Sequence, residues 1–147
     1  MNHAYPVLSQ TAVVYTRWML FGDKTVSWFD LWSVEHFLTG LSLAVVFRKR
    51  DLGLGWFLAF TFAWEMLEHY LEIGWAGSVV KSWFCGVEFW GNRMLGDPAM
   101  MLLGWRYAAR ASDDSVLLAR TLSALWLFLH VLALPDSMAL QRAAFGN

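Results

Sequence analysis

Four ionisable residues recur at helical spacing within an otherwise apolar segment. They are Glu65, Glu68, His69 and Glu72, and their separations place them on one face of a helix. Carboxylates and imidazoles on facing helices form the metal sites of helical bundles, and a Glu–His pair can also act as a general base. The sequence therefore predicts a catalytic or metal-binding site along this face of the helix, which we call the stripe.

Two further polar groups flank the stripe, one in the preceding apolar segment and one just before the following apolar segment. A charged side chain near the centre of a bilayer costs a few kcal/mol and normally faces a partner inside the bundle. We therefore expect the three groups to face one another. The predicted catalytic residues are Glu35, His36, Glu65, Glu68, His69, Asn92 and Asp97, and the predicted ligand-binding residues are Arg93 and Glu88.

These residue types suit more than one ligand. The pocket could bind or act on a lipid headgroup, an anionic small molecule or a divalent metal, and Arg93 could hold a phosphate. The Glu-x-x-His spacing of diiron proteins is absent, as is the His-Glu-x-x-His motif of zinc proteases. No serine lies in a nucleophile motif, so the reaction, if there is one, stays open.

Several of these residues also have structural interpretations. Asp97, followed by a proline, is typical of a helix N-terminus. Arg93 could serve only as the partner of a carboxylate in the helix that carries the stripe. Glu72 is expected to be solvated at the membrane interface, and the isolated His130 to be a satisfied interior histidine. A purely structural bundle could use leucine at the remaining positions, which favours a functional role for them.

The composition indicates a membrane protein. The chain has 147 residues, of which 58% are hydrophobic and 16% charged, whereas about 25% is usual for soluble domains. Its ten tryptophans suit a long lipid perimeter with two interfaces. The net charge is −1 without a basic stripe, which argues against a nucleic-acid partner, and the single cysteine excludes a disulfide framework.

The apolar segments predict one all-α membrane domain covering residues 1–147. A spanning helix needs about 20 mostly apolar residues. We predict four transmembrane helices, an interfacial helix over 7–21 that could instead be a fifth span, and an outer loop or re-entrant lid over 74–96. The four predicted spans cover 29–47, 52–73, 97–111 and 116–134.

Basic residues set the expected orientation. They concentrate in two segments, 48–51 and 106–120, which four-span topology places on the same side. Cytoplasmic loops carry an excess of Lys and Arg, so we expect both segments to be cytoplasmic, in a bacterial inner membrane. The N-terminus lacks the pattern of a cleavable signal, so the apolar segments should remain in the mature protein.

The order of the polar motifs can be compared with known families. The order comprises a histidine with a following glycine, then an acid pair, and then an asparagine with an aspartate. In this chain these motifs are Glu35-His36-Phe37-Leu38-Thr39-Gly40, Trp64-Glu65-Met66-Leu67-Glu68-His69 and Gly91-Asn92-Arg93-Met94-Leu95-Gly96-Asp97. Over about residues 30–105 this order resembles the VanZ-like proteins and related small bacterial membrane proteins. The resemblance implies a multispan envelope protein, in some members linked to glycopeptide tolerance, without an agreed reaction.

A non-catalytic role is the alternative. The chain could be an accessory subunit of a larger membrane complex, with its tryptophan-rich faces docking other subunits and its polar cluster holding the bundle together. Membrane lipids are the expected partners in either case.

Overall fold

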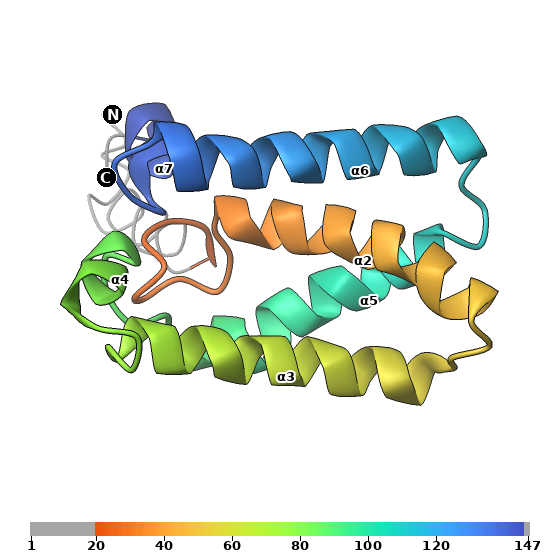
Figure 1. The fold of residues 1–147 in the computed structure, drawn as a ribbon, viewed down its shortest axis with the longest axis horizontal. Coiled ribbons are helices and arrows are strands. Elements are labelled where there is room, and N and C mark those ends of the chain that lie inside the picture. The colour runs from red at the N-terminus through yellow and green to blue at the C-terminus, as the bar shows by residue number, and fades with distance from the viewer. Residues whose placement is uncertain (1–19, 146–147) are drawn as a thin grey trace, which may run out of the picture.

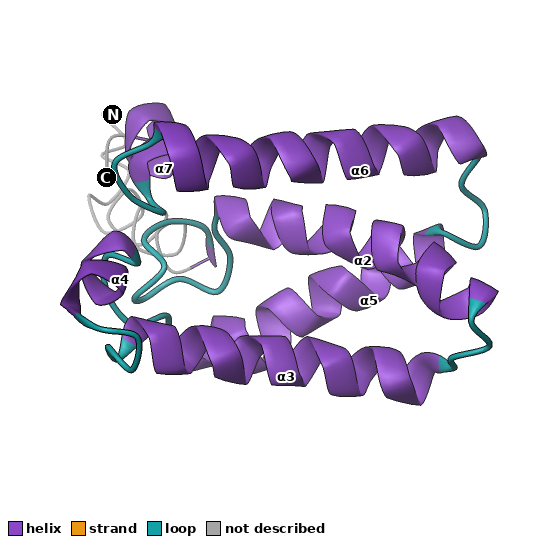
Figure 2. Cartoon of the chain, in the orientation of Figure 1, coloured by secondary structure: helices purple, strands orange, loops and turns teal. Residues whose placement is uncertain are grey.

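The computed structural model describes residues 20–145, and this part of the chain is helical without a β-strand (Figures 1 and 2). The elements, two of them short π-helices, are α2 (Leu31–Lys49), α3 (Leu54–Glu72), α4 (Ser78–Trp83), η1 (Asn92–Gly96), α5 (Asp97–Tyr107), α6 (Asp113–Phe128), η2 (Leu129–Ala133) and α7 (Ala139–Phe145). The predicted all-α fold is confirmed for these residues.

Helix α2 lies at the centre of the bundle. It packs against α5 and α6, whereas α3 packs mainly on α5 and on the elements at the α4 end (Figure 1). Two glycines allow the close approach of α2 and α5. A Cβ atom at Gly40 would overlap the backbone of Met101, and one at Gly104 would overlap the backbone of Phe37. This contact holds the first turns of α2 beside the start of α5.

A capping box sets the start of α2. Asp30 Oδ1 accepts hydrogen bonds from the backbone N–H groups of Trp32 and Ser33 at 2.8 and 3.1 Å. The Ser33 hydroxyl accepts in return from the Asp30 backbone N–H at 3.2 Å. Arg48 and Lys49 occupy the last turn, where positive charge complements the helix dipole. The helix predicted over 29–47 is therefore present, shifted by two residues.

The other predicted helices are present with different ends. Helix α3 begins at Leu54 rather than 52, and α6 begins at Asp113 rather than 116 because the Ser112 side chain caps it. Helix α5 ends at Tyr107 rather than 111. Segment 74–96 contains α4 and η1, and the short α7 was not predicted. Of the predicted helix over 7–21, residues up to 19 lie outside the described part of the chain.

The two basic segments lie at the same end of the bundle. The turn between α2 and α3 and the connection between α5 and α6 are neighbours at the end opposite α4 and α7 (Figure 1). Arg48 Nη2 donates to the backbone carbonyl of Trp105 at 2.8 Å, which ties the two together. The predicted sidedness of the basic segments relative to each other is thus present in the fold.

Burial in the bundle is inverted relative to a water-soluble protein. Among residues 20–145, sixteen buried residues are polar or charged and eight are hydrophobic. Large apolar side chains cover the outside instead: Trp56 is 67% exposed and Leu132 is 71% exposed. Charged residues are almost never fully buried in soluble proteins unless they are paired. The polar residues therefore occupy the interior and apolar residues the perimeter.

One helix in the described range, Asp113–Ala133, is long and apolar enough to cross a membrane by length and composition. Buried core helices of soluble proteins can be equally long and apolar, but only 22% of the apolar stretch in Asp113–Ala133 is buried. The other three predicted spans do not meet this criterion. Helices α2 and α3 are interrupted by polar site residues, and α5 has 11 residues, fewer than the about 20 that a span needs.

Candidate metal centre

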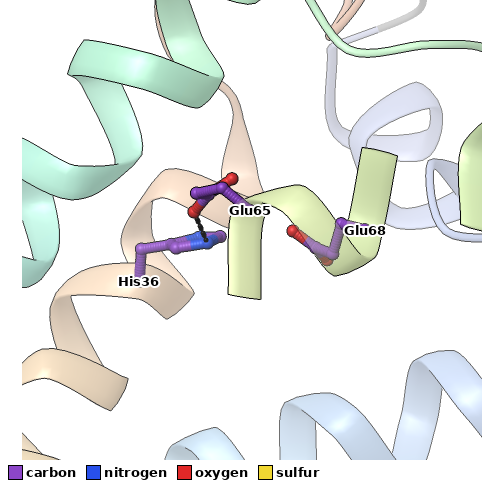
Figure 3. Close-up of side chains that lie close together, drawn as sticks. All are labelled: His36, Glu65 and Glu68. Atoms are coloured by element: carbon purple, nitrogen blue, oxygen red, sulfur yellow. Dashed lines mark ion pairs between the residues drawn. The ribbon is translucent and has the colours of Figure 1, made fainter. Parts of the chain in front are cut away.

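The centre of the candidate site is a contact between α2 and α3. His36 and Glu65 are both buried, and His36 Nε2 lies 3.2 Å from Glu65 Oε1. His36 Nδ1 donates to the backbone carbonyl of Trp32 at 2.8 Å. This hydrogen bond requires a proton on Nδ1. In the neutral imidazole a lone pair of Nε2 then faces the carboxylate, whereas in the imidazolium Nε2–H faces it and the two side chains form the buried ion pair marked in Figure 3.

Glu68 adds a second carboxylate from α3. One donor atom each of His36, Glu65 and Glu68 lies within 4.8 Å of the others. Figure 3 shows the carboxylate of Glu68 directed toward the other two side chains. Within residues 20–145, His36 Nε2 and both carboxylate oxygens of Glu65 are buried without a hydrogen-bond partner. Such unpaired buried groups are rare in folded proteins and need an explanation.

A second acidic group shares Glu65. Donor atoms of Glu65, Glu88 and Asp97 also lie within 4.8 Å of one another. Asp97 Oδ1 accepts from the Ser33 hydroxyl at 2.7 Å, and Asp97 Oδ2 lies 3.8 Å from His36 Nδ1. Carboxylates of α3 and α5 therefore both lie within 4 Å of the His36 imidazole, and Glu88 of the 84–91 segment lies beside these carboxylates.

Two cations neutralise the outer part of this acidic cluster. Arg93 is fully buried, and its Nη2 lies 2.5 Å from Glu72 Oε2 and 3.0 Å from Glu88 Oε2. Arg93 Nη1 donates to the backbone carbonyl of Glu65 at 2.6 Å. Lys24 Nζ lies 2.8 Å from the second oxygen of Glu72. Arg93 is thus a structural partner of a carboxylate on α3, and neither cation contacts the carboxylates of the His36 triad.

Asn92 links the two parts of the site. Its Nδ2 donates to Glu88 Oε1 at 2.5 Å and to Asp97 Oδ2 at 3.2 Å. The interpretation of Asp97 as a helix cap is wrong. Residues 90–91 are already helical and continue into η1, so the Asp97 backbone N–H bonds to the carbonyl of Asn92. The Asp97 side chain is therefore free to bond across to α2.

Two predicted catalytic residues lie apart from the cluster. Glu35 accepts hydrogen bonds from the hydroxyls of Thr39 and Ser123, the latter at 2.6 Å, on the side of α2 that faces α6. His69 follows Glu68 by one position, about 100° around the helix, and its ring lies beside those of Tyr70 and Trp90. Glu68 and His69 therefore point in different directions from α3.

Sequence reasoning missed other members of the site. The expectation that Glu72 is solvated is wrong, because it is 3% exposed and held by Lys24 and Arg93. Lys24 and Asp30 were not assigned to the site, although Lys24 is one of few cations among the acids of the predicted outer segments. His130 is buried and donates to the Trp126 carbonyl at 2.9 Å, as expected of an interior histidine.

The electrostatics of the loops show an excess of negative charge. Burial, together with the charge of Asp97, raises the pKa of Asp30 to about 7. The same two causes raise the pKa of Glu88 to about 10. Both carboxyls lie outside the long helices, at the end of the bundle that carries α4. Binding of protons or of another cation relieves this charge.

The site opens toward the same end through a small cavity of about 30 Å³. Lys24, Asp30, Glu72, Phe84 and Glu88 contribute to its wall. A cavity of about 10–15 Å³ suffices for one water molecule, so this one can admit water or a small ion. The predicted lid over 74–96 supplies part of this wall, and the Ser137 backbone N–H holds it by donating to the Trp83 carbonyl at 2.9 Å.

Comparison with models of protein families found no match to this chain, and neither did comparison with curated protein sequences or with solved structures. The geometry of the site therefore has to indicate its function.

Proposed function

We propose that the chain is an integral membrane protein that binds one divalent transition-metal ion through His36, Glu65 and Glu68. The observation that carries this proposal is the buried contact between Nε2 of His36 and a carboxylate of Glu65 whose oxygens have no hydrogen-bond partner among residues 20–145. A cation between these donors satisfies them together. Imidazole and carboxylate ligands suit Zn²⁺, Fe²⁺ and Mn²⁺.

The surroundings of His36 fit a metal ligand. Histidines that bind metals nearly always donate their second ring N–H to a carboxylate or a backbone carbonyl. His36 does so through the Trp32 carbonyl, with Asp97 Oδ2 at 3.8 Å from the same nitrogen. Two donors that each lie about 2.1 Å from one ion are at most about 4.2 Å apart. A small rotation of Glu65 or Glu68 brings the donors, now within 4.8 Å, to that separation.

Three protein ligands leave a coordination position open. Catalytic zinc sites have this arrangement, in which the remaining position holds water or substrate. The cavity beside His36 and Glu68 provides room for such a ligand. The site is therefore suited to polarising a bound oxygen, and the chain's own residues would hold and orient the ion.

The inverted burial supports a bundle of four membrane-embedded helices, namely α2, α3, η1 with α5, and α6 with η2. The end of the bundle that carries both basic segments would face the cytoplasm of a bacterial cell by the positive-inside rule, which places the metal site in the outer half. The resemblance to VanZ-like proteins fits this proposal, because His36, Glu65, Glu68, Asn92 and Asp97 carry it and lie in or beside the cluster.

Metal titration of the full chain in detergent tests the proposal. After treatment with a chelator, isothermal titration with Zn²⁺ should show one site, and Mn²⁺ should bind the same site more weakly. Mutation of an outer-shell partner alone costs 10–100-fold in metal affinity, so His36→Ala and Glu65→Gln should each lower it by about 100-fold or more.

His69→Ala is the matched control, because it removes an imidazole one position from Glu68 without touching the three donors. It should bind Zn²⁺ as the wild type does. If the wild type takes up no metal, or if His36→Ala binds it equally well, His36 is not a ligand and the proposal is wrong.

The accessory-subunit alternative makes a different prediction for the same variants. If the polar cluster only holds the bundle together, metal has no effect on the chain, and the native protein migrates at the mass of a larger complex. That alternative leaves the unpaired donors of His36 and Glu65 without a role.

A further inference from the structure

A second, larger cavity lies on the other side of His36 and Glu68. Its volume is about 210 Å³, which exceeds the roughly 150 Å³ of an apolar protein cavity that holds a benzene ring. One wall is a single face of α2, and it runs from Trp32 and His36 through Thr39 to Leu43. At 1.5 Å per residue this wall is about 17 Å long.

The cavity is polar at one end and apolar along the rest. Its polar end is formed by Glu35, His36 and Glu68 near the proposed metal, and by Thr39. The rest is lined by apolar side chains from four helices, among them Leu43, Phe60, Met101 and Leu127. A ligand that matches this lining has a polar head and a hydrocarbon chain.

The fold opens this cavity sideways, between α3 and α6. These helices lie on opposite sides of α2 (Figure 1), and the main contacts of α3 are with α5 and with elements at the α4 end. Three residues of the rim are half exposed: Phe60 and Trp64 at 42% each, and Leu127 at 43%. In the proposed membrane bundle, this rim faces the acyl chains of the bilayer.

The width of the cavity limits the occupant to something thinner than a helix. A volume of about 210 Å³ spread along the roughly 17 Å wall of α2 corresponds to a passage about 4 Å wide for the centres of water-sized atoms, or about 7 Å wide in all. A helix with its side chains is about 10–12 Å in diameter. Part of a single hydrocarbon chain fits, whereas the transmembrane helix of a partner or of a second copy does not enter.

We infer that this cavity, hereafter the α2 groove, binds one acyl chain of a membrane phospholipid and brings its headgroup to the His36–Glu65–Glu68 site. The inference rests on the proposed function, because it needs the bundle in a membrane and the polar site at the end of the groove. The acids around the site outnumber Lys24 and Arg93, so a zwitterionic lipid with an amine-bearing head suits it better than an anionic one.

Native mass spectrometry of the full chain with added palmitoyl-oleoyl phosphatidylethanolamine tests this inference. The wild type should retain one lipid per chain. Leu127→Trp places a larger side chain in the groove and should lower lipid retention at least tenfold. The matched control is Leu125→Trp, on the same helix and outside the groove lining, which should retain the lipid as the wild type does. Leu43→Trp, which narrows the groove from α2, gives a second test if Leu127→Trp does not fold.

The results separate this inference from the metal proposal. Leu127→Trp should still bind Zn²⁺ with wild-type affinity, because Leu127 contributes no metal ligand. A wild type that binds lipid but no metal contradicts the metal proposal and leaves the groove assignment standing. The assignment is overturned if the groove variants retain lipid like the wild type, if the wild type retains none, if phosphatidylglycerol is preferred, or if the chain is a lipid-free dimer.

Discussion

Two adjacent residues of α2 lie in contrasting surroundings. Glu35 faces α6, where the hydroxyls of Thr39 and Ser123 donate to its carboxylate. His36 faces α3, where its Nε2 lies 3.2 Å from the carboxylate of Glu65, and neither group has a hydrogen-bond partner among residues 20–145. Both residues are buried and ionisable, so neither burial nor the ability to carry a charge distinguishes them. What distinguishes the functional candidate is the shortage of partners, which a bound ion would supply.

The largest effect on stability is expected at Arg93, because its side chain is buried and largely paired. Replacement of Arg93 by leucine leaves Glu72 and Glu88 without their shared cation, although Lys24 still contacts Glu72. Breaking a buried ion pair from one side costs about 3–5 kcal/mol. We expect Arg93→Leu to lower the free energy of unfolding by that amount in detergent, measured by circular dichroism against denaturant. Arg106→Leu, at an exposed site, should change it by about 0.5 kcal/mol or less, and equal effects would contradict the pairing.

Leucine at Glu35 and leucine at both members of the His36–Glu65 pair should act with opposite sign in metal-free protein. Glu35→Leu leaves the hydroxyls of Thr39 and Ser123 without their acceptor, which costs about 1–3 kcal/mol. The double replacement of His36 and Glu65 by leucine removes a buried pair whose carboxylate oxygens have no hydrogen-bond partner among the described residues, so it should be neutral or stabilising. Unfolding in the presence of EDTA measures both. If the double replacement destabilises the metal-free protein as much as Glu35→Leu does, the pair holds the bundle together and the comparison fails.

The pH dependence of stability follows from Asp30. Its pKa is raised from 3.8 to about 7 by burial and by Asp97, so the folded state favours the protonated carboxyl. The stability that this provides is complete below about pH 4 and is lost as the pH rises through 7. Asp30→Asn keeps an N-cap but cannot titrate, so its unfolding midpoint should depend less on pH between 4 and 7 than that of the wild type. Identical pH profiles would show that Asp30 is charged in the folded protein at neutral pH.

The smallest effect on stability is expected for the exposed ion pair between Asp136 and Arg142. Arg142 Nη2 lies 2.6 Å from Asp136 Oδ2, and the Arg142 side chain is 44% exposed. This cation lowers the pKa of Asp136, but exposed ion pairs contribute about 0.2–1 kcal/mol. Asp136→Asn should therefore shift the free energy of unfolding by less than about 1 kcal/mol, and the shift should shrink in high salt. A larger, salt-independent loss would indicate that Asp136 holds the 134–138 segment in place.

Local pattern was sufficient for the helices of the site. The spacing from Glu65 to Glu72 predicts one helical face, and α3 presents Glu65, Glu68 and Glu72 to the cluster. The start of α5 was less predictable. Asp97 before a proline has the chemistry of a helix start, but the π-helix η1 continues the helix on its N-terminal side. Whether a helix begins at such a residue depends on hydrogen bonds of preceding residues, which its own side chain does not determine.

The number of membrane spans likewise depends on more than the composition of each helix. Helix α6 with η2 meets the criterion by its composition, whereas α2 and α3 carry the polar residues that the interior of the bundle requires. Average hydropathy over a helix cannot separate a buried polar face from a lipid-facing apolar face. The arrangement of neighbouring helices decides which residues of α2 and α3 face inward.

The sequence by itself determined the helical class, the approximate helices and the residue types of the site, because these depend on composition and on spacing within about two turns. Only the tertiary structure decided which acids are paired. The close contact of α2 with α5 at Gly40 and Gly104 sets the position of His36 beside Asp97, and Arg93 reaches Glu72 across 21 positions of sequence. Pairing of buried charges depends on distances between separate helices, and these distances determine which donors remain open to a metal ion.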